Sequence, residues 1–326
     1  MLNEDEIIDL AGRLFGRGGA EVITGVGDDA AVIKAGGETW LWAADMLVEG
    51  VHFERPWTTP QDLGRKALAV NLSDMAAMGG EGDYALFSVA LPDGLDSVWV
   101  EELFGGLAGA AREYSVKVLG GDTTGSPGPI MLNLSLWGRA YEGLAVLRRT
   151  GKAGDTLFVS RPLGAAAAAL AGFKAGREVQ PALARALTDP RPEVELGPFL
   201  AAEGLVSAMI DLSDGLGVDA GRLAQASGLA AVIAAEAVPI DPEAVALAAE
   251  LGRDPLTWAL AGGEDYALLM ACHPQAAGPL EAGVRDRWGR RLFAVGRLEA
   301  GRGVFVETGQ EKRAARFTGF NHFDRG

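Results

Sequence analysis

The sequence predicts a mixed α/β (α+β) fold built from two domains. The chain has 326 residues, hydrophobic residues make up 48% of them, and strand-like and helix-like segments mix in both halves. A domain commonly takes roughly 100–200 residues, and such a mixture is typical of sheets covered by helices. We expect an N-terminal domain over residues 1–140 and a C-terminal domain over residues 141–326, because a Gly-rich and basic segment lies near residues 140–155.

Hydrophobic periodicity places the elements of the first half. Asn3 is expected to cap a first helix, and Asp62 is expected to cap a second helix over residues 62–80 that ends at Gly79-Gly80. A third helix is expected over residues 97–114. Apolar runs and alternating patterns predict strands over residues 30–33, 39–44, 84–91, 116–121 and 130–140.

The second half continues with the same mixture of elements. The patterns predict helices over residues 163–173, 215–226 and 242–251. They predict strands over residues 156–160, 207–212, 230–235, 265–272, 292–298 and 304–307.

Charge and cysteine content exclude several classes of protein. The net charge is −15, so general electrostatics oppose binding to nucleic acid and to anionic membranes, and we expect neither as a partner. Cys272 is the single cysteine, which excludes a disulfide within the chain. The acidic N-terminal segment lacks the pattern of a signal peptide, and no apolar run reaches the ~18 residues of a membrane helix. We therefore expect a cytoplasmic protein.

Carboxylates flanked by small residues recur along the chain. Asp28 and Asp29 stand together in GVGDDAAV with no basic residue nearby in sequence, and such neighbours raise each other's pKa unless a cation joins them. Because most of these motifs fall at expected strand–loop junctions, we expect them to meet in one cleft and to hold several Mg²⁺ ions, which would let an acidic protein bind phosphates. The further carboxylates, in AADML, NLSDM, GGDTT, IDLSDG and AGGEDY, are Asp45, Asp74, Asp122, Asp211, Asp214, Glu264 and Asp265.

Each acidic motif alone also has a purely structural explanation. Asp28-Asp29 could form a turn, Asp214 could cap a helix, and Asp74 could lie on a solvated helix face. The number of motifs favours the metal site over these readings. Other signatures are absent from the sequence: it has no GxxxxGK[ST], GxGxxG, HExxH, CxxC or GxSxG motif, and its three histidines make a His-rich zinc site unexpected.

Together the ordered motifs resemble those of the thiamine-monophosphate kinase family, which shares a superfamily with aminoimidazole ribonucleotide synthetase. The motifs are GVGDDAAV, ADMLVEGVHF, RKALAVNLSDMAAMGG, LGGDTTGS, DLSDGL, GGEDYALL and TGFNHF, and the resemblance runs from about residue 4 to the C-terminus. It implies a two-domain aminoimidazole ribonucleotide synthetase-like fold whose N-terminal domain pairs across a homodimer. It also implies direct in-line, Mg²⁺-assisted transfer of the γ-phosphoryl group of ATP to thiamine monophosphate.

The resemblance further implies roles for individual residues. An acceptor phosphate is largely ionised near neutral pH, because its second pKa is about 6, so no side chain is expected to act as a strong base or nucleophile. Ala43-Ala44 stands where the family usually has Ser-Thr, so backbone carbonyls would replace two hydroxyl ligands there. The implied Mg²⁺ ligands are Asp28, Asp45, Asp74, Asp122, Asp211 and Asp214; the implied ATP contacts are Gly121, Asp122, Arg148 and Ser213; the implied thiamine monophosphate contacts are His52, Glu264 and Phe320.

Two alternatives stay open at this point. The chain could be another ATP-using member of the superfamily, similar to aminoimidazole ribonucleotide synthetase, or a non-catalytic module that binds divalent cations. A panel of acceptor substrates scored by ADP release separates the first alternative, and calorimetry that finds Mg²⁺ binding without turnover identifies the second.

Overall fold

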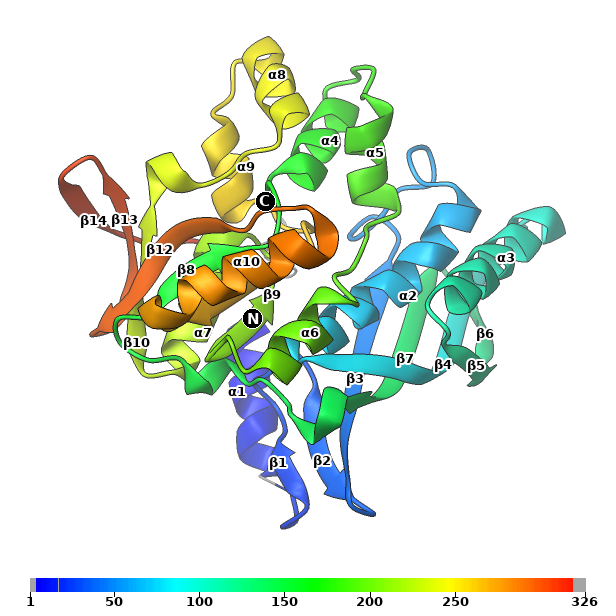
Figure 1. Cartoon of the computed structure of the whole chain (residues 1–326). Coiled ribbons are helices and arrows are strands. Elements are labelled where there is room, and N and C mark those ends of the chain that lie inside the picture. The colour runs from blue at the N-terminus through cyan, green and yellow to red at the C-terminus, as the bar shows by residue number, and fades with distance from the viewer. Residues whose placement is uncertain (1–3, 17, 319–326) are drawn as a thin grey trace.

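The computed structural model describes residues 4–16 and 18–318, and within them the strands form two sheets that lie side by side (Figure 1). The first sheet has the order β1-β2-β3-β7-β4-β5, with β6 beside β4. Neighbouring strands are antiparallel, except that β5 and β6 run parallel to β4. The strands are β1 (Val22–Thr24), β2 (Ala31–Ala35), β3 (Glu38–Val48), β4 (Gly80–Pro92), β5 (Lys117–Gly120), β6 (Thr123–Ser126) and β7 (Met131–Ala140).

Two helices, α2 (Pro60–Ala77) and α3 (Ser97–Glu113), pack against one face of the first sheet. Buried leucines and methionines of α2 share one core cluster with the inward side chains of β3, β4 and β7. The two helices approach closely at Gly64 and Gly106, where an added Cβ would overlap a backbone carbonyl of the other helix. This packing fixes the position of α2, which carries Asp74 on its cavity side.

The opposite face of the first sheet is apolar and exposed. Side chains of a strand alternate between faces, so Asp45 of β3 points toward α2 while Trp42 and Met46 point outward and are 45% and 54% exposed. Trp137 of β7 stacks on Trp42 with ring centroids 5.2 Å apart. The exposed large side chains of this face are Trp42, Met46, Tyr84, Leu86, Leu119, Met131 and Trp137, here called the apolar sheet face.

The second sheet lies in the C-terminal half. Its order is β14-β13-β10-β12-β8-β11-β9, and among its strand pairs only β10 and β13 run parallel within the described residues. The strands are β8 (Thr156–Val159), β9 (Ala208–Asp211), β10 (Leu229–Ala234), β11 (Leu268–Cys272), β12 (Phe293–Ala300), β13 (Gly303–Thr308) and β14 (Glu311–Ala315).

Helices cover both faces of the second sheet. On one face, α6 (Leu196–Glu203) and α10 (Ala277–Trp288) bury a cluster that also takes in Ala76 and Ala77 at the end of α2, which joins the two halves. On the other face lie α7 (Leu216–Ala226) and α9 (Pro255–Ala261). A third layer packs α4 (Ala165–Lys174), α5 (Pro181–Thr188) and α8 (Pro242–Leu251) into a separate cluster.

The predicted mixed fold is confirmed, and the predicted domain boundary between residues 140 and 141 stays a prediction. The strands of the first sheet lie within residues 22–140 and those of the second within residues 156–315. Among the described residues, no helix combines the length and the apolar character needed to cross a bilayer.

Several local predictions were wrong or incomplete. The side chain of Thr59, not that of Asp62, caps α2: its hydroxyl accepts the N–H of Asp62, and Pro60 opens the helix. The first helix, α1 (Glu4–Phe15), is present, but its expected cap Asn3 lies outside the described residues. The expected strand over residues 265–272 begins only at Leu268. Other elements were missed: β1, β6, β14, α5, α6 and α9 are short, whereas α10 has 12 residues.

Candidate active site

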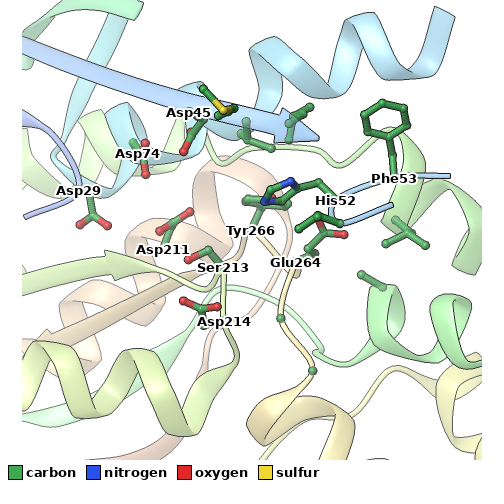
Figure 2. Close-up of a pocket in the computed structure, with 18 of the residues that line it drawn as sticks. Asp29, Asp45, His52, Phe53, Asp74, Asp211, Ser213, Asp214, Glu264 and Tyr266 are labelled. Atoms are coloured by element: carbon green, nitrogen blue, oxygen red, sulfur yellow. The ribbon is translucent and has the colours of Figure 1, made fainter. Parts of the chain in front are cut away.

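A cavity of about 790 Å³ lies between the two halves of the chain. The first half contributes the acidic loop before β2, the end of β3, the loop after it and one side of α2. The second half contributes α4, the loop between β9 and α7, and the segment before β11. The side chains labelled in Figure 2 come from both halves and line this space, and the ring of Phe53 turns away from the others into the core of the first half.

Three aspartates from distant parts of the sequence meet at one end of the cavity. Asp29 precedes β2, Asp74 lies on α2 and Asp211 ends β9, and one carboxyl oxygen of each lies within 4.8 Å of the others. Asp45 lines the same cavity beside Asp74, whose pKa its charge raises, and it completes the group, which we call the aspartate cluster. The expectation that scattered acidic motifs converge in one cleft therefore agrees with the geometry for these residues.

The aspartate cluster is electrostatically costly without a cation. Burial, reinforced by Asp45, Asp211 and Asp29, raises the pKa of Asp74 well above its usual value. Burial followed by the charge of Asp29 raises the pKa of Asp211 in the same way, and burial raises the pKa of Asp45 to about 6. Closely spaced carboxylate oxygens are the donors that Mg²⁺ prefers, so the donor set fits such an ion.

Arg148 supplies the positive charge that the sequence around Asp28-Asp29 lacks. Its Nε donates to Asp29 Oδ2 at 3.1 Å, Nη2 donates to Asp29 Oδ1, and its backbone N–H points at both oxygens of Asp28 at 3.4 Å. Burial still raises the pKa of Asp28 to about 6, with Asp29 adding to it and Arg148 opposing it. Sequence proximity could not reveal this partner, because Arg148 and Asp29 are 119 positions apart.

The order of the two neighbours also matters. Asp28 was the expected ligand and lines the cavity, but its carboxylate is engaged by the backbone N–H groups of Asp29 and Arg148. Asp29 was left out of the expected ligand set, yet it is the member that reaches Asp74 and Asp211. The motif GDD does not by itself tell which carboxylate turns inward.

The loop between β9 and α7 contributes Ser213 and Asp214 to the cavity. Asp214 pairs with Arg222 of α7. Asp219, which sequence reasoning missed, is fully buried and accepts the N–H groups of Asp214 and Gly215 at 3.0 and 3.1 Å. Burial raises the pKa of Asp219 to about 7. The side chain of Asp219, not that of Asp214, therefore satisfies the backbone donors at this helix start.

Gly121 and Asp122 do not line this cavity. They join β5 to β6, where Asp122 is exposed and accepts the N–H of Thr123 at 2.9 Å. An added Cβ on Gly121 would overlap the backbone of Phe87, so only glycine fits this close approach between strands. Their assigned roles at an ATP site stay predictions.

The other end of the cavity holds His52 and Glu264, two of the three expected thiamine monophosphate contacts. His52 Nδ1 accepts the N–H of Val48 at 3.0 Å, so a neutral imidazole carries its proton on Nε2. Glu264 bonds to the buried ammonium of Lys66 at 2.8 and 3.0 Å. Lys66 was not singled out, although it lies in the quoted motif RKALAV. The third expected contact, Phe320, lies outside the described residues.

The neighbours of Glu264 serve different purposes. Asp265 turns away and accepts the N–H of Gly164, at the start of α4, at 2.9 Å, and burial raises its pKa to about 7. Tyr266 lines the cavity between the aspartate cluster and Glu264 (Figure 2). Burial, followed by the charge of Glu264, raises the pKa of Tyr266 well above its usual value.

Comparison with known proteins identifies the family to which this chain is related. The family model for the AIR synthase related protein N-terminal domain matches residues 27–140, and the model for the corresponding C-terminal domain matches residues 152–309. A thiamine-monophosphate kinase of Mycobacterium tuberculosis is 38% identical over 287 residues, covering 87% of this chain and 84% of that protein. The chain belongs to the thiamine-monophosphate kinase family.

Solved structures show that the three-dimensional fold of this chain also matches that of known proteins. A structure of AaThiL complexed with AMPPCP and TMP has a TM-score of 0.87 and 32% identity, and the match covers 99% of this chain and 97% of that one. The thiamine-monophosphate kinase of Salmonella typhimurium is 35% identical over 86% of this chain and 85% of its own length. The expected two-domain fold of the thiamine-monophosphate kinase family is therefore confirmed.

Proposed function

We propose that this chain catalyses transfer of the γ-phosphoryl group of ATP to thiamine monophosphate, giving thiamine diphosphate and ADP. Membership of the thiamine-monophosphate kinase family supports this reaction. The observation that carries the proposal is a single cavity with the aspartate cluster at one end and the His52–Glu264 pair at the other. One end suits phosphates accompanied by cations, and the other suits an organic substrate.

The aspartate cluster would hold Mg²⁺ through Asp29, Asp45, Asp74 and Asp211. Such ions bound there would neutralise negative charge on the phosphates of both substrates and on the transferring group. Asp28, Asp122 and Asp214 remain proposed ligands, and of these Asp28 and Asp214 line the same cavity.

Two arginines and a serine line the cavity close to the aspartate cluster. Arg148 pairs with Asp29, and Arg222 pairs with Asp214. Ser213 lies on the loop between Asp211 and Asp214. We propose that Arg148 and Ser213 contact the phosphates of ATP, because a guanidinium binds phosphate oxygens through several donors at once. An ATP analogue in the AaThiL complex agrees with ATP as the phosphoryl donor.

The substrate end of the cavity suits thiamine monophosphate. Glu264 offers carboxylate oxygens, and a neutral His52 keeps its proton on Nε2 because Nδ1 accepts a backbone N–H. An anionic acceptor phosphate needs no strong base to become a nucleophile. The chain's own contribution is therefore to hold the two substrates in line rather than to abstract a proton.

We also propose that the chain forms a homodimer through the apolar sheet face. Trp42, Met46 and Trp137 are too large and too exposed to be scattered surface residues, and they form one continuous patch with their neighbours on four strands. Contiguous apolar patches of this kind mark interaction surfaces. A second copy of the same sheet supplies a matching partner by symmetry.

The decisive experiment measures ADP release by the purified chain with ATP, Mg²⁺ and a panel of phosphate acceptors. We expect turnover with thiamine monophosphate and thiamine diphosphate as the product. Turnover only with an aminoimidazole ribonucleotide precursor would assign the other superfamily activity. Calorimetric Mg²⁺ binding without any turnover in a folded sample would identify a non-catalytic module.

A further inference from the structure

Lys66 is a fully buried cation at the junction of the two halves. It lies on α2, only 1% of its side chain is exposed, and its Nζ donates to three separate segments. The acceptors are the backbone oxygen of His52 at 3.1 Å, that of Leu187 at 3.0 Å, and both carboxylate oxygens of Glu264 at 2.8 and 3.0 Å. Burying an ammonium is costly unless its protons are all accepted, and here each of the three protons has an acceptor.

Each of these acceptors belongs to a segment that borders the cavity. His52 lies on the loop after β3, and Leu187 lies in the last turn of α5, where helical carbonyls lack partners within the helix. Glu264 lies in the segment before β11, and its backbone has a φ of +59°, which a residue with a side chain rarely adopts. Contacts from outside the segment must hold such a conformation. The N–H of Glu264 bonds to Ser213, and its carboxylate bonds to Lys66.

We propose that Lys66 is a positioning residue that sets the spacing and orientation of Glu264 and His52 for the organic part of the phosphoryl acceptor. This inference rests on the proposed function. Glu264 is 22% exposed in its side chain and faces the cavity, whereas Lys66 is sealed behind it. Lys66 therefore acts on the substrate through Glu264 and through the loop that carries His52, without touching the substrate itself.

The pairing also changes what Glu264 offers to a ligand. An unpaired glutamate would present a full negative charge, but here the ammonium of Lys66 offsets it. Glu264 consequently acts as an oriented hydrogen-bond acceptor with a reduced net charge. The contribution of Glu264 to binding should depend on the geometry of the hydrogen bond that its carboxylate accepts. A ligand without a matching donor or a localised positive charge should therefore bind less tightly.

The neighbouring residue Arg65 provides a matched control. It lies on the same helix and also joins the two halves, through Asp189 at 2.8 Å, and it pairs with Glu113 of the first half at 2.7 Å. None of these three residues lines the cavity. Removing Arg65 should weaken the junction between the halves without altering the substrate end. Removing Lys66 should alter both.

The experiment compares Lys66→Met with Arg65→Met in steady-state kinetics, in calorimetric binding of thiamine monophosphate without ATP, and in thermal unfolding. We expect Lys66→Met to raise KM and the calorimetric Kd for thiamine monophosphate by about 10- to 100-fold, with kcat and the KM for ATP changed by less than about threefold. Arg65→Met should lower the unfolding temperature and leave both substrate constants unchanged.

A double-mutant cycle tests whether Lys66 acts through Glu264. Lys66→Met/Glu264→Gln removes both charges, so it leaves no buried ion without a partner, and it is compared with Glu264→Gln alone. We expect the added Lys66→Met to weaken thiamine monophosphate binding by less than about 10-fold in the Glu264→Gln background, because only its effect through the loop that carries His52 remains to be lost. This comparison remains decisive if Lys66→Met alone does not fold.

Two results would overturn the inference. The first is unchanged thiamine monophosphate affinity in Lys66→Met, and the second is an equal loss of affinity on adding Lys66→Met to wild type and to Glu264→Gln. A failure of the proposed function would look different, since wild-type protein would then neither turn over nor bind thiamine monophosphate.

Discussion

Asp74 is the residue of the candidate site whose ionised form is opposed by burial and by three neighbouring aspartates. It lies on α2 among Asp29, Asp45 and Asp211, and burial with these neighbours raises its pKa well above its usual value. A side chain that only stabilised the fold would not be placed among like charges. The arrangement is understandable if the charges are kept for a ligand, because active sites trade stability for such groups.

Replacing Asp74 should separate stability from activity. We expect Asp74→Asn to lower turnover of thiamine monophosphate by at least ~100-fold, because an oxygen ligand and a charge are lost. In chelator, the same variant should unfold at a higher temperature than wild type, because repulsion within the aspartate cluster is relieved. Asp93→Asn, on an exposed turn, should change neither quantity. Undiminished turnover in Asp74→Asn would contradict the assigned role.

The pH dependence of stability should reveal the raised pKa of Asp45. Its pKa is about 6 in the folded chain against 3.8 ordinarily, so the folded state holds this proton more tightly than the unfolded state. The stabilising effect of that proton is present at low pH and is lost as pH rises to about 6. In metal-free thermal unfolding, wild type should therefore lose stability relative to Asp45→Asn between about pH 4 and pH 6. A difference that stays constant over this range would refute the raised pKa.

At the scale of residues, the sequence shows which kinds of side chain form the site better than it shows where each side chain points. The glycine-flanked aspartates predicted an acidic site. The GDD motif could not show that the side chain of Asp29 turns toward Asp74 and Asp211. The partners Arg148 and Lys66 were hidden because each lies more than 100 residues from the carboxylate it pairs with. Only the tertiary fold brings these charges together.

At the scale of elements, α2 carries much of the proposed chemistry. It holds Lys66 at its N-terminal half and Asp74 near its C-terminal end, so one rigid helix fixes the distance between the two ends of the cavity. Thr59 and Pro60 define where this helix starts. Any shift of that start would move both functional side chains together.

Two substitutions can test which side chain caps the N-terminus of α2. Thr59→Ala removes the hydroxyl that accepts the N–H of Asp62, and we expect the free energy of unfolding to fall by about 1 kcal/mol. Asp62→Ala should cost less, because its carboxylate does not cap the helix and contributes only through the helix dipole. Denaturant unfolding of both variants makes the comparison. A larger loss in Asp62→Ala would favour the cap expected from the sequence.

Most long periodic elements were predictable, with the 12-residue α10 as an exception, whereas several short elements were not. The helices over residues 62–80 and 97–114 and the strand over residues 130–140 carry enough repeats to be recognised, and all three exist. Elements such as α5 and α9 have too few turns to establish a helical period and begin at prolines that also mark turns. The strand β6 reads as a glycine turn and forms only because β4 lies beside it.

At the scale of the whole molecule, the apolar sheet face and the aspartate cluster use opposite sides of β3. Trp42 and Met46 point away from α2, whereas Asp45 between them points toward it. A partner covering the outer face would therefore leave Asp45 uncovered, and it would meet the cavity where Met46 lines it. This arrangement is compatible with the proposed homodimer.

A charge placed in the apolar sheet face should separate the two copies. We expect wild type to sediment with twice the mass of the 33.9 kDa chain. Leu86→Lys, at a residue of the apolar sheet face that does not line the cavity, should sediment as a single chain at micromolar concentration. Val245→Lys, which places the same charge on an exposed side chain of α8, should leave the mass unchanged. A wild-type protein that sediments as one chain would argue against the proposed pairing.

The central claim is that aspartates from both halves bind divalent cations between two phosphate-bearing substrates. Anomalous diffraction from crystals grown with Mn²⁺, a non-hydrolysable ATP analogue and thiamine monophosphate measures this directly. We predict Mn²⁺ peaks at bonding distance from carboxylate oxygens of Asp29, Asp74 and Asp211. Both substrates bound, with no Mn²⁺ at these carboxylates, would contradict the claim.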